Sequence, residues 1–175
     1  MIEVLVASLL ALVLFSATLA AFETSQKVQA RDTEWALTLQ EGRAGLARMA
    51  REIRQASKVE KAEAGTIDIL ATIAGKSWQI KYECGVAQSG TTYDECVRFA
   101  AEEGKSLPTT GSPVVRDVAN GTAVFTYTPS VSPTVVTMKV ELPAKGTLKQ
   151  AGSSGYSHAV VLENGAFMRN LDLAG

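Results

Sequence analysis

The first 22 residues form an almost unbroken run of apolar side chains. Glu3 is the only charged residue in this run, and its other polar side chains are Ser8, Ser16 and Thr18. As an α-helix rising about 1.5 Å per residue, the run would measure roughly 33 Å, enough to cross a hydrocarbon core of about 30 Å. The pattern therefore predicts a membrane-spanning helix. Because a carboxylate inside such a helix is costly, we expect Glu3 to have a specific partner and a function.

The following segment is polar but lacks a helix breaker, since residues 23–63 contain no proline. Its apolar side chains recur at intervals of three or four residues, or their sum, and these side chains are Trp35, Leu39, Leu46, Met49 and Ile53. Such spacing is typical of one face of an amphipathic helix. We therefore expect one helix over residues 1–63, with this apolar stripe packed against a sheet.

Two further features of the amphipathic part bear on its surroundings. Gly42 and Gly45 each cost about 1 kcal/mol of helix propensity relative to alanine, so we expect a sheet to approach the helix backbone closely there. The part is also locally basic, through Arg43, Arg48, Arg51, Arg54 and Lys58. We interpret these side chains as a solvated face with ion pairs to Glu41 or to neighbours. Nucleic-acid contact is the alternative, but the aromatic or glycine interleaving typical of it is missing.

From residue 64 onward the apolar residues alternate with polar ones, as in strands. The strands that this pattern predicts cover residues 66–73, 77–82, 96–100, 114–118, 123–127, 135–142, 157–163 and 166–171. Gly75, Asn120-Gly121 and Asn164-Gly165 are turn signals that predict hairpins. The predicted fold class is α+β, in which a long helix, apolar over residues 1–22 and amphipathic over residues 23–63, packs on an antiparallel β-rich head of residues 64–175.

Composition and candidate chemistry argue against several function classes. The chain has 175 residues, a net charge of −1 and only 20% charged residues, so one modest domain remains beside the apolar helix and no strong field favours nucleic acid. His158 is the single histidine and lies in a strand-like stretch, where a structural role is favoured over that of a catalytic base. We predict no enzyme activity, no metal site and no cofactor.

The N-terminal residues Ile2-Glu3-Val4-Leu5-Val6-Ala7, followed by an apolar helix, resemble the mature N-terminus of type IV pilins and of the pseudopilins of type II secretion. Residues 37–56, the strands from residue 114 to residue 142 and residues 167–170 are similar to the larger minor pilins and the J-type minor pseudopilins. In that family a basic leader ending in glycine is removed by prepilin peptidase, and the new N-terminus is methylated. Only Met1 and Ile2 precede Glu3, so we expect the leader to lie upstream or to differ in this chain.

The resemblance implies a structural subunit, minor rather than major, of a type IV pilus or a type II secretion pseudopilus. Its implied partners are other pilin or pseudopilin subunits, prepilin peptidase and an inner-membrane assembly platform. The implied location is the cytoplasmic (inner) membrane, with a single span and an extracytoplasmic head, and then a periplasmic or cell-surface filament. Glu3 is the implied assembly residue, paired with the N-terminal amine of an adjacent subunit.

The implied extracytoplasmic head favours a disulfide between the two cysteines of the chain, Cys84 and Cys96. The alternative is a pair of buried free thiols. An alternative function also remains, in which the chain is a single-span, membrane-anchored extracytoplasmic binding module that forms no filament. In that case Glu3 would be incidental.

Overall fold

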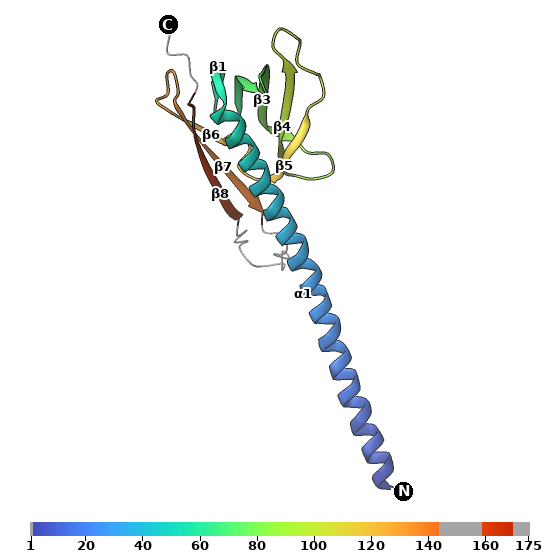
Figure 1. Ribbon diagram of the computed structural model, residues 1–175. Coiled ribbons are helices and arrows are strands. Elements are labelled where there is room, and N and C mark those ends of the chain that lie inside the picture. The colour runs from blue at the N-terminus through green and yellow to red at the C-terminus, as the bar shows by residue number, and fades with distance from the viewer. Residues whose placement is uncertain (1, 144–158, 170–175) are drawn as a thin grey trace. The chain divides into compact units, whose positions relative to one another are not determined.

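The computed structural model describes residues 2–143 and 159–169, apart from the side chains at positions 27, 28, 30–32 and 34. The chain divides into two compact units, Met1–Leu37 and Thr38–Gly175. Helix α1 (Ile2–Arg54) provides the first unit and the beginning of the second (Figure 1). The two units are described in turn.

The first unit is helical, and its side chains up to Gln26 are exposed. The stretch Ile2–Gln26, with a mean hydropathy of 2.5, is long and apolar enough to cross a membrane, judged by length and composition. The hydroxyl groups of Ser8, Ser16, Thr18 and Thr24 are satisfied within the helix. Ser8 Oγ donates to the carbonyl oxygen of Leu5 at 2.9 Å, and Thr18 Oγ1 donates to that of Phe15 at 2.8 Å. Such bonds allow hydroxyl side chains to sit in an apolar surrounding without an external partner.

The second unit contains two antiparallel sheets. The first has the strand order β1-β2-β3-β4-β5 and consists of β1 (Ala56–Glu63), β2 (Thr66–Ile73), β3 (Lys76–Ala87), β4 (Asp94–Glu102) and β5 (Ser112–Val118). The second has the order β6-β7-β8 and consists of β6 (Phe125–Thr128), β7 (Val135–Pro143) and β8 (Ala159–Phe167). The predicted fold class is therefore confirmed: a long, N-terminally apolar helix packs against an antiparallel β-domain.

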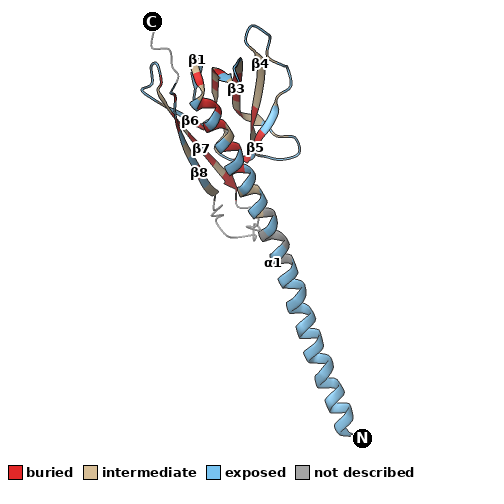
Figure 2. Ribbon diagram, in the orientation of Figure 1, coloured by how far each residue is buried: buried red, intermediate tan, exposed pale blue. Residues whose placement is uncertain are grey.

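The part of α1 that belongs to the second unit packs against both sheets, as the buried residues in Figure 2 indicate. A Cβ atom added at Gly45 would lie 2.4 Å from the carbonyl oxygen of Val114 in β5. One added at Gly42 would lie 2.8 Å from Cδ1 of Leu142 in β7. The predicted close approach of sheet to helix backbone at the two glycines is thus confirmed.

The helix is shorter than the sequence predicts, because α1 ends at Arg54 and residues 56–63 form strand β1. The predicted boundary between the amphipathic helix (residues 23–63) and the head (residues 64–175) is therefore wrong, because the helix ends nine residues earlier, at Arg54. Strand β1 pairs with β2 along its length, from Ala56↔Ala71 to Glu63↔Thr66. The lysine, glutamate and alanine side chains of this segment favour a helix locally, but that preference is weak and pairing with β2 overrides it.

Of the three predicted hairpins, the one at Gly75 is confirmed. Ile73 pairs with Lys76, and the two residues between them, Ala74 and Gly75, have φ of 52° and 77°. Positive φ at both central positions is the geometry of the two-residue turn that matches the twist of antiparallel strands.

The prediction of a hairpin at Asn120-Gly121 is wrong, because this dipeptide connects the two sheets. β5 pairs with β4, whereas β6 pairs with β7. The Asn120 amide holds the connection in place: its Nδ2 donates to the carbonyl oxygen of Lys139 at 2.9 Å, and its Oδ1 accepts the backbone N–H of Glu141 at 3.0 Å. Asn120 thus uses its side chain to bond to the backbone of β7.

The predicted hairpin at Asn164-Gly165 is also wrong. Both residues lie inside strand β8, where Asn164 pairs with Met138 and Gly165 with Thr137. The register of β7 with β8 is continuous over nine residue pairs, so a favourable long-range ladder overrides the local turn preference. Residues 157, 158, 170 and 171 of the predicted strands lie outside the described residues, as does His158.

Candidate functional site

The first candidate is the apolar surface of α1 with Glu3 in its first turn. Leu5, Leu12 and Phe15 are each at least two-thirds exposed, and the other large apolar side chains of this stretch are also more than half exposed. A continuous apolar surface of this kind marks a contact with membrane or protein. Glu3 is exposed within it, at the helix N-terminus, where the helix dipole favours a negative charge.

The predicted packing stripe divides at the boundary of the two units. Leu46, Met49 and Ile53 are at most 3% exposed and belong to the core cluster, and Leu39 is half-buried against it. Trp35 is half-buried but lies in the unit Met1–Leu37 and is not part of that cluster. The described core therefore takes up α1 from Leu39 onward.

Cys84 and Cys96 lie directly opposite each other in the β3–β4 ladder, with an S–S distance of 2.04 Å and a Cα–Cα distance of 4.0 Å. Both residues are buried, and the alternative of two free thiols is not what the structure has. β3 and β4 continue beyond the cysteines to the pair Ala87↔Asp94. The ladder therefore continues past the disulfide, and the loop between the two strands covers residues 88–93.

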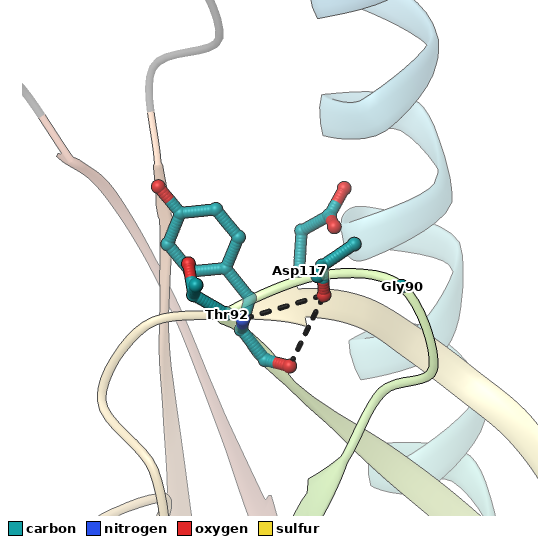
Figure 3. A pocket seen from close by; sticks show the side chains of 5 residues that line it. Gly90, Thr92 and Asp117 are labelled. Carbon is teal, nitrogen blue, oxygen red and sulfur yellow. Dashed lines mark hydrogen bonds between the residues drawn. The ribbon is translucent and has the colours of Figure 1, made fainter.

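A shallow depression lies at the tip of this loop, lined by Gly90, Thr91, Thr92, Tyr93 and Asp117 (Figure 3). Thr91 Oγ1 accepts the backbone N–H of Tyr93 and donates to its carbonyl oxygen, both at 3.3 Å. The backbone N–H of Asp117 donates to Oε1 of Gln88 at 2.9 Å. These contacts order the loop, and within the described residues no cluster of three potential metal ligands is found.

The described head contains a buried polar cluster around Glu52 that sequence reasoning missed. Glu52, on the buried face of α1, accepts hydrogen bonds from Arg98 Nε at 2.8 Å, Tyr82 Oη at 2.7 Å and Arg48 Nε at 3.3 Å. Tyr82 and Arg98 are a directly opposed pair of β3 and β4. The two strands therefore present both donors to the helix at one point of the sheet.

The electrostatics of this cluster follow from its burial and its hydrogen bonds. Burial raises the pKa of Glu52, but the bonds from Arg98 and Tyr82 lower it more, so that its pKa lies below the usual value. Burial, together with the Glu52 carboxylate, raises the pKa of Tyr82. Burial lowers the pKa of Arg98, but its bond to Glu52 outweighs this and raises it. At neutral pH Glu52 is therefore a carboxylate, Arg98 is a guanidinium cation and Tyr82 is a neutral phenol. This suits a structural role, and none of the three groups is poised to exchange a proton.

The basic residues of the amphipathic part have different environments. Arg43, Arg51 and Arg54 are exposed, as predicted for a solvated face. Arg48 pairs with the buried Glu52, and Lys58 pairs with Glu60 at 2.8 Å within β1. Ion pairs to neighbours, one of the two expected arrangements, are therefore present, whereas among the described residues none of these five basic side chains pairs with Glu41. Glu41 instead approaches Arg116 of β5, at 4.0 Å.

Comparison of the chain with models of known protein families, with curated proteins and with solved structures finds no match. An N-terminal apolar helix followed by an antiparallel sheet is nevertheless compatible with a pilin-like fold.

Proposed function

We propose that this chain is a non-enzymatic structural subunit of a pilin-type filament, either a type IV pilus or a type II secretion pseudopilus. The observation that carries the proposal is the exposed apolar stretch Ile2–Gln26, which has Glu3 in its first turn and no other charged residue before Glu23. The N-terminal motif, which resembles that of pilins, supports it.

An apolar surface on all sides of a helix suits two environments. Lipid can surround it when the subunit is in the membrane, and the helices of other subunits can surround it in a filament. Glu3 distinguishes these environments, because an unpaired carboxylate in hydrocarbon costs several kcal/mol by order of magnitude. In the proposed filament, Glu3 pairs with the N-terminal amine of a neighbouring subunit. This ion pair favours transfer of the helix from the lipid into the filament.

The head would then be the part exposed outside the membrane. The buried Cys84–Cys96 pair supports an oxidising, extracytoplasmic compartment, since stable disulfides are rare in the cytosol. The loop-rich head and the absence of proline from the apolar stretch support a minor subunit. Subunits, prepilin peptidase and an inner-membrane assembly platform remain the partners in this proposal.

Replacement of Glu3 tests the proposal. Glu3→Leu should leave the chain in the membrane and strongly reduce its recovery in purified filaments. Ser8→Ala is a matched control, because Ser8 lies about one turn further along the same stretch and its hydroxyl is satisfied by Leu5. Equal recovery of the Glu3→Leu variant and the wild type would refute the assembly role. If neither the wild type nor the Glu3→Leu variant is found in filaments although both are in the membrane, the result would favour the anchored binding module.

A further inference from the structure

We draw no further inference here: the strongest candidate, the shallow depression at the tip of the loop between β3 and β4 that is lined by Gly90, Thr91, Thr92, Tyr93 and Asp117, is open to solvent, and nothing in the described part of the chain shows which ligand would occupy it.

Discussion

Glu52 of helix α1 and Arg98 of strand β4 form a direct ion pair, with 2.8 Å between Oε2 and Nε. The side chains are 9% and 15% exposed, so this pair is largely removed from water. Tyr82, opposite Arg98 in the ladder, donates to the same carboxylate oxygen. Because three donors from α1, β3 and β4 converge on one carboxylate, the register of the helix on the first sheet is fixed by a polar contact in addition to apolar packing.

Arg98→Met should destabilise the head by about 3 kcal/mol, since it leaves the Glu52 carboxylate buried without its main partner. Tyr82→Phe should cost less, about 1–2 kcal/mol, because one hydrogen bond to a charged group is lost. Arg48→Ala is the control and should cost under about 1 kcal/mol, since its side chain is 43% exposed. Urea unfolding measures all three. A cost for Arg48→Ala as large as that for Arg98→Met would contradict this ranking.

The same cluster predicts a pH dependence. Glu52 has a lowered pKa in the folded chain, so the unfolded chain binds its proton more tightly. Its contribution to stability is therefore fully present above the usual carboxyl pKa and is lost as the pH falls through the lower, folded pKa. The difference in urea midpoint between wild type and Glu52→Gln should be constant near neutral pH and shrink in acid. A difference that grows on acidification would show that the sign is wrong.

Gly45→Ala should destabilise the head even though alanine is the better helix former by about 1 kcal/mol. The new methyl group would meet the backbone oxygen of Val114 at 2.4 Å, and overpacking of this kind costs about 1–3 kcal/mol. Gly42→Ala should cost less, because its methyl group meets the movable ends of Leu142 and Leu162. Thermal melts of the two variants provide the comparison. A more stable Gly45→Ala chain would contradict the close contact.

Removal of the disulfide should weaken the head without unfolding it. The bond closes a sequence separation of 12 residues, for which the chain-entropy estimate is about 2–3 kcal/mol. In the double variant Cys84→Ala/Cys96→Ala the pair Ala87↔Asp94 and the rest of the β3–β4 ladder remain. Circular dichroism should show the same strand content with a lower melting temperature. Alkylation of native protein without reduction, followed by mass spectrometry, should find no modified cysteine.

The sequence predicts those parts of the fold whose pattern is strong and local. Residues 66–73 were predicted as a strand and are β2 (Thr66–Ile73), since isoleucines alternate with polar residues there. The apolar helix follows from its composition alone. Residues 56–63 could not be placed, because a charged outer strand has the composition of a helix and only its partner β2 decides its structure.

The candidate site could be predicted only in part. Glu3 stands out as the single charge in an apolar run, and two nearby cysteines suggest their own pairing. Glu52 gave a weaker signal, as an acid next to Ile53 on the apolar stripe, but Arg98 is 46 residues away and no local pattern links them. That residues 159–167 form one strand could not be predicted either, because only the long pairing with β7 keeps Asn164-Gly165 inside it.

A chain that begins at Lys27 should fold as a soluble protein with cooperative unfolding. The buried apolar core residues that the structure describes lie in the unit Thr38–Gly175, and the stretch Ile2–Gln26 contributes none of them. Its removal also takes away the large apolar surface that would drive association in water. A single urea transition, seen alike by tryptophan fluorescence and circular dichroism, is the expected result. Non-cooperative unfolding would show that residues 27–175 do not form a self-sufficient core. In the truncated chain, Arg98→Met should lower the urea midpoint, because the Glu52–Arg98 ion pair lies entirely within the unit Thr38–Gly175.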